Sequence, residues 1–227
     1  MLIQFGTNLY LADGPTVSFN GFPYPTRMAV ARLSTGALWV WSPVALTEAL
    51  ATVVDALGPV AHIVSPNKLH HLFMPAWKAR WPAARLHAPP GLSRKRKDIH
   101  FDAELDEATN APWQADLAQV VFGGSFAMDE VAFFHRESRT AIFGDLIQRF
   151  PRAGATGWKG LVMRLDDLVG PHGSTPREWR LTFVPRRRAR AARSTVLAWD
   201  AQRLVVAHGD CAATGAGPLI EAALRWI

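Results

Sequence analysis

Four side chains of the kinds that bind metal ions lie in three distant parts of the chain, namely His70, His71, Asp145 and His208. Each of the three parts follows a short apolar run that has the length of a buried strand. In layered α/β proteins, binding sites assemble at the carboxyl ends of strands. Imidazole and carboxylate groups are ligands of zinc and also of iron and manganese. The sequence therefore predicts a metal site that folding assembles at one edge of a sheet.

The number of ligands decides what such a site does. Three protein ligands leave one coordination position open, and zinc then lowers the pKa of a bound water to about 7. Four protein ligands close the site and make it structural. We expect one zinc ion, with iron or manganese as alternatives, and a metal-free polar network remains open as the other interpretation.

Lys68 lies in the loop that carries the two adjacent histidines. Its ammonium group is suited to binding an anionic part of a substrate; the alternatives are an ion pair with Asp145 and a solvated side chain. A buried carboxylate without a partner is unfavourable. We therefore expect Lys68, His71 or a metal ion to neutralise Asp145.

Length and composition favour one core. The 227 residues are 49% hydrophobic, which is sufficient for one large core, and we expect a single domain over residues 1–227. No run approaches the roughly 18 apolar residues of a membrane span, and the first residues do not read as a signal peptide. The single cysteine excludes an internal disulfide and fits a reducing compartment, so the expected location is the cytoplasm.

Basic residues gather in two clusters, at 94–97 and 186–193, in a chain of net charge +6. Neither cluster has interleaved aromatic residues, and no nucleic-acid recognition motif accompanies them. We interpret both as solvated faces and expect a small-molecule ligand, with no nucleic acid and no membrane as partner. The sequence does not indicate an oligomeric state.

Hydrophobic periodicity and turn residues predict two β-rich halves flanked by helices. In the first half we expect a hairpin at 2–11, a loop at 14–25, strands at 28–33 and 37–41, a helix at 46–57, a strand at 61–64, a short helix near 73–81 and a strand at 84–88. In the second half we expect strands at 117–122, 130–135 and 140–144, helical or mixed segments at 161–169 and 177–184, a helix at 186–199, a strand at 204–207 and a helix at 220–226. The loop at 14–25 holds Asn20, Phe22 and Tyr24, which we expect to line the site.

This order of elements resembles the metallo-β-lactamase superfamily. The main motif of that family, Thr-His-x-His-x-Asp-His, corresponds to residues 65–71 here, with His70 at the Asp position and His71 at the last His position. The family's bridging Asp ends a strand after Gly and corresponds to Asp145. Its final metal-binding His precedes Gly in many members and corresponds to His208.

The resemblance implies an α/β (α+β) fold, namely a four-layer αββα sandwich of two mixed β-sheets with outer helices. It also implies that one of the family's two metal sites is lost. Pro66 and Lys68 replace the first two histidines of the motif, and no histidine lies near residues 123–125. The positions of the second site carry the four side chains named at the outset, so the chain is similar to a degenerate, DUF4336-like member of an uncharacterised subfamily.

What the resemblance implies about activity follows from that remaining site. It implies at most a mononuclear metal site, and a hydrolase of a small ester, thioester or lactone. The alternative is a non-catalytic member of the fold that binds a small molecule or a partner. The sequence identifies no catalytic acid or base.

Overall fold

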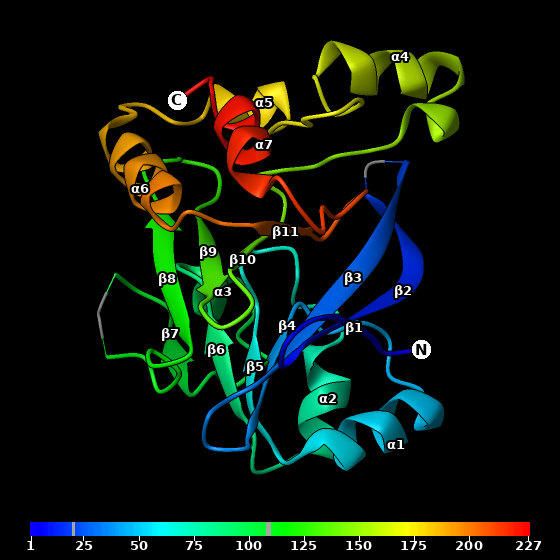
Figure 1. Ribbon diagram of the computed structural model, residues 1–227, viewed down its shortest axis with the longest axis vertical. Helices are drawn as coiled ribbons and strands as arrows, with labels where there is room; N and C mark the ends of the chain where they lie inside the picture. Colours follow the sequence, from blue (N-terminus) through cyan, green and yellow to red (C-terminus); the bar gives the residue numbers. More distant parts are fainter. Residues whose placement is uncertain (20, 108–109) are drawn as a thin grey trace.

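Two mixed β-sheets pack face to face in the computed structural model, which describes residues 1–19, 21–107 and 110–227 (Figure 1). The larger sheet has the order β1 (Ile3–Gly6), β2 (Leu9–Phe19), β3 (Phe22–Arg32), β4 (Leu38–Trp41), β5 (Val60–Val64), β6 (Arg85–Ala88) and β7 (Ala103–Glu104). Its first four strands are antiparallel and the rest run parallel to β4. The smaller sheet has the order β11 (Arg203–Val206), β10 (Thr140–Phe143), β9 (Glu130–His135) and β8 (Leu117–Phe122). In this sheet β10 and β11 are parallel and the other neighbours are antiparallel.

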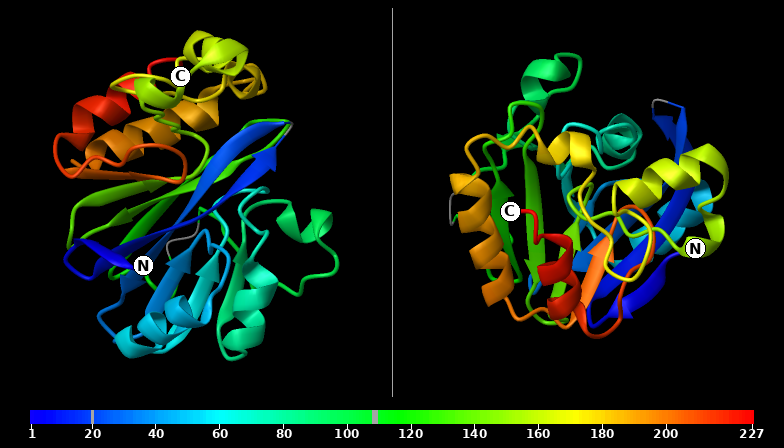
Figure 2. Two further views of the ribbon diagram at one scale, coloured as in Figure 1. Left: turned by 90° about the vertical axis from the view of Figure 1, so that its right-hand side faces the viewer. Right: turned by 90° about the horizontal axis from the view of Figure 1, so that it is seen from above.

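Helices cover the outer face of each sheet (Figure 2). Buried side chains of α1 (Glu48–Leu57) and α2 (Met74–Arg80) pack on the larger sheet, and those of α6 (Arg187–Ala198) and α7 (Ala216–Ala223) pack on the smaller one. The remaining helical segments are α3 (Leu92–Lys95), η1 (Arg152–Gly154), α4 (Gly157–Leu165) and α5 (Arg177–Arg180). None of the described helices has the length and apolar character that crossing a membrane requires.

The alternation of side chains along the strands produces these layers. On β4, Trp39 and Trp41 point between the sheets, whereas Leu38 and Val40 point toward α1 and α2. A second set of buried side chains joins the smaller sheet to its helices. The expected αββα sandwich is therefore confirmed.

One prediction about the first half is wrong. The segment at 14–25 is not a loop, because β2 and β3 continue through it as a paired ribbon, with Thr16 opposite Pro25 and Val17 opposite Tyr24. Before Ala29, the residues of β3 pair only with β2, so the other edge of this part of the strand needs no backbone donor. Proline is tolerated on such an edge, and the prolines that suggested a loop do not interrupt the strand.

Candidate metal centre

Two parallel neighbours of the smaller sheet bring Asp145 and His208 together. Phe143 of β10 pairs with Val206 of β11, and the two site residues each lie two positions further along. The Nε2 atom of His208 is 3.1 Å from Oδ1 of Asp145. The carboxyl ends of adjacent strands thus form the edge that the sequence pattern indicated.

Both site residues have a glycine neighbour for a steric reason. A Cβ atom at Gly144 would lie 2.9 Å from Oε2 of Glu130, so a side chain there would displace a buried carboxylate. Gly209 has a φ of +98°, and a Cβ atom there would lie 2.1 Å from the carbonyl oxygen of Arg149. The residues beside Asp145 and His208 are therefore glycines because the backbone and its neighbours leave no room.

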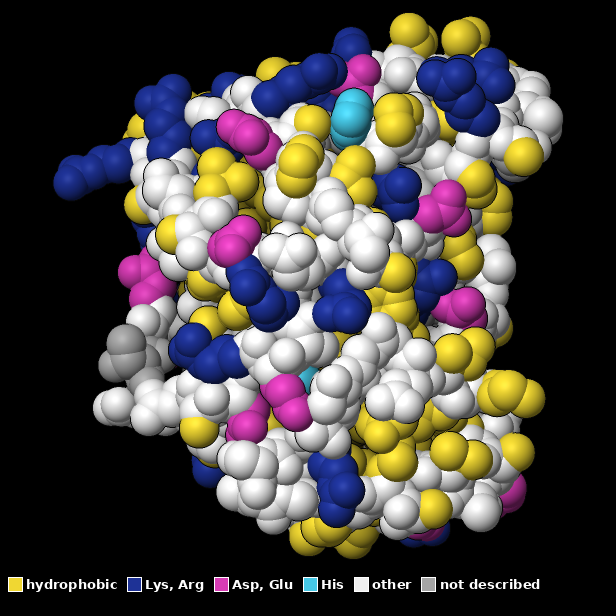
Figure 3. Space-filling view, in the orientation of Figure 1, with side chains coloured by type: hydrophobic (Ala, Val, Ile, Leu, Met, Phe, Trp, Pro, Cys, Tyr) yellow, Lys and Arg dark blue, Asp and Glu magenta, His cyan; other side chains and the backbone are white. Residues whose placement is uncertain are grey.

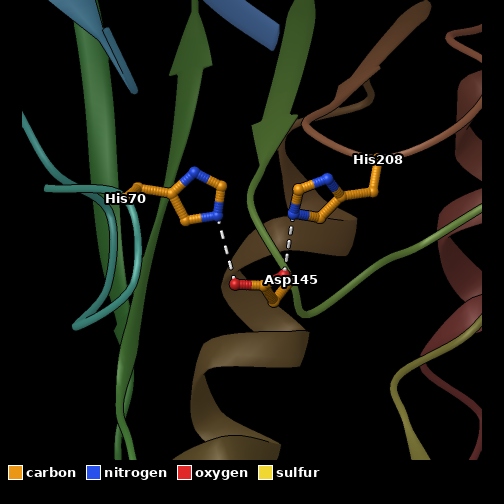
Figure 4. Close-up of side chains that lie close together, drawn as sticks. All are labelled: His70, Asp145 and His208. Carbon is orange, nitrogen blue, oxygen red and sulfur yellow. Dashed lines mark hydrogen bonds and ion pairs between the residues drawn. The ribbon is translucent and has the colours of Figure 1, made fainter. Parts of the chain in front are cut away.

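His70 reaches the same point from the larger sheet, through the loop that follows β5 (Figure 4). Its Nε2 atom is 3.1 Å from Oδ2 of Asp145, and its ring stacks on Trp41 with the centroids 6.0 Å apart. One ligand atom from each of His70, Asp145 and His208 lies within 4.8 Å of the others. This buried group could hold a metal ion.

Amide groups complete the environment of the carboxylate. Asn67 Nδ2 donates to Oδ2 of Asp145 at 2.8 Å, and Gln148 Nε2 donates to Oδ1 at 3.2 Å. Each carboxylate oxygen therefore faces one imidazole and one amide. This arrangement fixes the orientation of the Asp145 side chain before any ligand arrives.

Glu130, the first residue of β9, organises the loop beneath the site and is fully buried. Its carboxylate accepts hydrogen bonds from the backbone N–H groups of Gly144, Asp145 and Leu146 at 2.7–3.2 Å, and from Asn67 Nδ2 at 2.7 Å. Glu130 thus holds both the loop that carries Asp145 and the amide that orients its carboxylate. Burial, and then the negative charge of Asp145, raise the pKa of Glu130 to about 7.

The protonation of His208 follows from its two partners. Its Nδ1 atom lies 2.7 Å from the carbonyl oxygen of Pro25, and a carbonyl can only accept, so Nδ1 carries a proton. The Nε2 atom faces a carboxylate oxygen, which also can only accept. His208 therefore either carries a second proton and forms an ion pair with Asp145, or shares a bound cation with it through its Nε2 lone pair.

The tautomer of His70 is not fixed in the same way. Its Nδ1 atom lies 2.7 Å from Oγ of Ser42, and a hydroxyl can donate or accept. Nε2 can therefore donate to Asp145 while Ser42 donates to Nδ1, or serve as a metal ligand while Nδ1 donates to Ser42. Ser42 supports both states without moving.

The ion-pair state agrees with the direction of two pKa shifts. Burial alone would raise the pKa of Asp145, but the two imidazoles outweigh it and hold this pKa well below its ordinary value. Burial alone would lower the pKa of His208, but the hydrogen bond to Asp145 and its charge raise it. The three side chains therefore form a strongly coupled polar group in the core.

The structure does not place His71 or Lys68 on this group. Nδ1 of His71 accepts from Nη1 of Arg96 at 2.7 Å, and burial followed by the charge of Arg96 lowers the pKa of His71 to about 4. Nζ of Lys68 lies 3.5 Å from the carbonyl oxygen of Ala127. The expectation that Lys68 or His71 neutralises Asp145 is therefore wrong, because His70 and His208 occupy its oxygens.

Tyr24, expected to line the site, lies edge-on to the ring of His208 with the centroids 5.0 Å apart. Burial and the charge of Asp145 raise the pKa of Tyr24 to about 12, so its hydroxyl stays protonated at neutral pH. Phe22 instead packs against Trp158, with the centroids 5.5 Å apart. The predicted role of Asn20 falls outside the described residues.

Sequence reasoning missed Glu130, Asn67 and Ser42. Glu130 did carry a signal, because it begins a run of apolar residues that predicts a buried strand, and a carboxylate there needs partners. Asn67 lies inside the motif-like segment at a position where the resembled family has no fixed residue. Ser42 follows a strand and carries no signal for a role beside His70.

The donor set fits a zinc ion chemically. Zinc bonds nitrogen and carboxylate oxygen at about 2.0–2.2 Å, which places tetrahedral neighbours roughly 3–3.5 Å apart. Each imidazole Nε2 lies 3.1 Å from a different carboxylate oxygen of Asp145, and one donor atom from each of the three residues lies within 4.8 Å of the others. The carbonyl of Pro25 and the hydroxyl of Ser42 could hold the opposite nitrogens in the tautomer that metal binding requires.

Comparisons with known proteins support this fold but do not identify a substrate. The model of a family described as Domain of unknown function (DUF4336) matches residues 19–156. No curated protein matches the chain.

Several solved structures share the fold along the whole chain. The DIM-1 metallo-β-lactamase exposed to ceftazidime is 15% identical, with a TM-score of 0.65 and coverage of 99% of this chain and 96% of that one. A metallo-β-lactamase from Hirschia baltica is 14% identical, with a TM-score of 0.64 and coverage of 100% and 96%. FIM-1 from Pseudomonas aeruginosa, in its mono-zinc form, is 13% identical, with a TM-score of 0.65 and coverage of 100% and 93%. At these identities the likeness establishes the fold alone.

Proposed function

The chain belongs to the family described as Domain of unknown function (DUF4336), and from the geometry of its candidate metal centre we propose that it is a mononuclear metal-dependent hydrolase of a small ester, thioester or lactone. The observation that carries the proposal is the convergence of His70, Asp145 and His208 on one buried point. Two imidazoles and one carboxylate leave a coordination position open, which is typical of catalytic rather than structural zinc sites. The mono-zinc form of FIM-1 supports a one-metal site on this fold.

The roles of the individual side chains follow from their contacts. His70 and His208 would bind through Nε2, and Asp145 through one oxygen, while Asn67 and Gln148 keep the carboxylate in place. When bound, zinc supplies a Lewis acid that polarises a carbonyl group and activates water.

One observation favours a second function. In the ion-pair state His70, Asp145 and His208 satisfy one another without an ion, since each carboxylate oxygen already has an imidazole partner 3.1 Å away. Such a network could remain in a non-catalytic member of the fold as a polar core. That protein would bind a small molecule or a partner and would have no turnover.

Zinc content and turnover measured together distinguish the two functions. The protein is treated with chelator, reloaded with zinc, dialysed and assayed for zinc by elemental analysis. The same samples are tested with an aryl ester, an acyl thioester and a γ-lactone. The hydrolase predicts about one zinc per chain and turnover that chelation removes and zinc restores.

The variant Asp145→Asn supplies the matched sample, because it keeps the shape of the side chain and removes its charge. It should lose both zinc and turnover. Full zinc occupancy without turnover on any of the three substrate classes would contradict the hydrolase, and absence of zinc would contradict the metal site itself.

A further inference from the structure

Two cationic side chains converge beside the loop that carries His70. A Cβ atom built at Gly91 would lie 3.2 Å from Nζ of Lys68 and 3.6 Å from Nη2 of Arg94. The two like charges are therefore within about 7 Å of each other, a separation at which they repel unless an anion lies between them. Gly91, with a φ of +78°, leaves room for this approach because it has no side chain.

Neither cation has an acidic partner in the described part of the chain. Arg94 makes no hydrogen bond or ion pair there, and the contact of the Lys68 ammonium is with the carbonyl oxygen of Ala127 at 3.5 Å. Glu104 approaches the same glycine, with Oε1 3.2 Å from the amide nitrogen of Gly91, and pairs with neither cation among the described residues.

Other basic residues nearby are already engaged. Arg96 is neutralised by Asp98, with two N–O distances of 2.7 and 2.8 Å. Lys95 donates to the carbonyl oxygen of Lys68 at 2.8 Å and so ties α3 to the loop of the metal centre. On the face shown in Figure 3, Lys and Arg side chains are spread among hydrophobic and acidic ones and are not gathered at one point.

The short loop joins this cationic point to the candidate metal centre. Asn67 and His70 turn inward to Asp145, whereas Lys68, between them in sequence, contacts the segment at Ala127. Two residues of chain span at most about 7 Å, so the backbone of Lys68 lies close to that of His70. The residue that carries the ammonium is therefore a near neighbour, along the chain, of a candidate metal ligand.

We propose that Lys68 and Arg94 form an anion-binding subsite beside the metal centre, which selects substrates that carry a carboxylate or phosphate group. The selection of a substrate rests on the hydrolase proposed above, whereas the binding of an anion does not. A carboxylate or phosphate presents two oxygens and can accept from both cations at once. The substrate class is thereby narrowed to an anionic ester, thioester or lactone.

Inorganic phosphate, titrated by calorimetry at low ionic strength, tests the subsite without any turnover. In Lys68→Gln and in Arg94→Gln the Kd for phosphate should rise at least about tenfold, and in Lys68→Arg by less than about threefold. Lys97→Gln is the matched control, because Lys97 is exposed in the same basic segment and should change the Kd by less than about twofold. Asp145→Asn, which removes the metal centre, should keep the binding.

Three outcomes would overturn the subsite. They are an equal loss of phosphate affinity in all three Gln variants, loss of phosphate binding in Asp145→Asn, and no saturable binding by wild type up to about 10 mM.

If turnover exists, a neutral aryl ester and its carboxylate-bearing analogue add a second readout. Lys68→Gln should then raise KM for the anionic ester only, with kcat little changed, and an equal rise for both esters would contradict the proposal. If turnover is absent, the hydrolase fails while the phosphate titration still decides the subsite.

Discussion

The described part of the molecule contains two buried histidine pairs, and a carboxylate lies between the two rings in one pair only. His70 and His208 have ring centroids 5.4 Å apart, and Asp145 lies between them. His62 of β5 and His87 of β6 have centroids 5.1 Å apart and meet directly, with Nδ1 of one 3.1 Å from Nε2 of the other.

The environment shifts the pKa of His208 in the direction opposite to that of His62 and His87. At the second pair, Trp113 covers both rings, and burial lowers the pKa of His62 to about 4 and that of His87 to about 3. At the first pair, the carboxylate of Asp145 overcomes burial and raises the pKa of His208. Close imidazoles alone thus form a neutral structural contact, whereas a carboxylate between them creates a group that holds a cation or a proton.

The largest effect should come from removing that carboxylate. Asp145→Asn should reduce bound zinc from about one equivalent to near zero, because a neutral amide is a poor ligand and leaves two imidazoles. His62→Gln should leave zinc unchanged. Elemental analysis after dialysis measures both, and circular dichroism confirms that each variant is folded. Zinc retained in Asp145→Asn, or lost in His62→Gln, would remove the distinction between the two pairs.

Acid should destabilise the protein through the second pair. Because the folded-state pKa of His87 lies near 3 and the unfolded value near 6.5, the unfolded chain binds the proton first as pH falls. Stability is therefore lost from pH 6.5 downward, by about 3 kcal/mol at pH 4 for this group.

Urea unfolding of chelator-treated protein at pH 6.5 and at pH 4 measures this loss in the free energy of unfolding. His87→Gln should lose about 3 kcal/mol less than wild type over this pH range, and the exposed His100→Gln should behave as wild type. An unchanged pH dependence in His87→Gln would show that this pair is not held neutral by burial.

Glu130→Gln tests the support beneath the first pair. The amide would turn a donor toward backbone N–H groups that Glu130 now accepts from, and Asp145 would lose its fixed position. We expect zinc affinity to fall about 10- to 100-fold, as for other partners that orient ligands. A competition titration with a chromophoric chelator measures the affinity. The exposed Glu137→Gln should change it by less than about twofold.

The smallest effect is expected for His71→Ala. Its Nδ1 accepts from Arg96 and it lies outside the candidate group, so zinc content should stay at the wild-type value. His208→Ala, measured beside it, should lose zinc. Loss of zinc in both variants would mean that His71 is a ligand after all, as the motif-like segment predicted.

The sequence predicted the features that depend on local residue patterns. It did not predict the side-chain contacts that depend on tertiary packing. Apolar runs ending at Asp145 and His208 placed both at one sheet edge, and the order of elements predicted the αββα sandwich. The sequence could not show which of the two adjacent histidines turns toward Asp145. That choice depends on Arg96, in a later segment, which donates a hydrogen bond to His71. The contact between His62 and His87 depends on the register of two parallel strands, and the residues of these strands do not predict that register.

The most direct test of the account is anomalous diffraction at the zinc edge from crystals grown with zinc. The account predicts one peak, within bonding distance of Nε2 of His70, Nε2 of His208 and an oxygen of Asp145. A peak between His62 and His87, or no peak at the three-residue group in fully zinc-loaded protein, would contradict it.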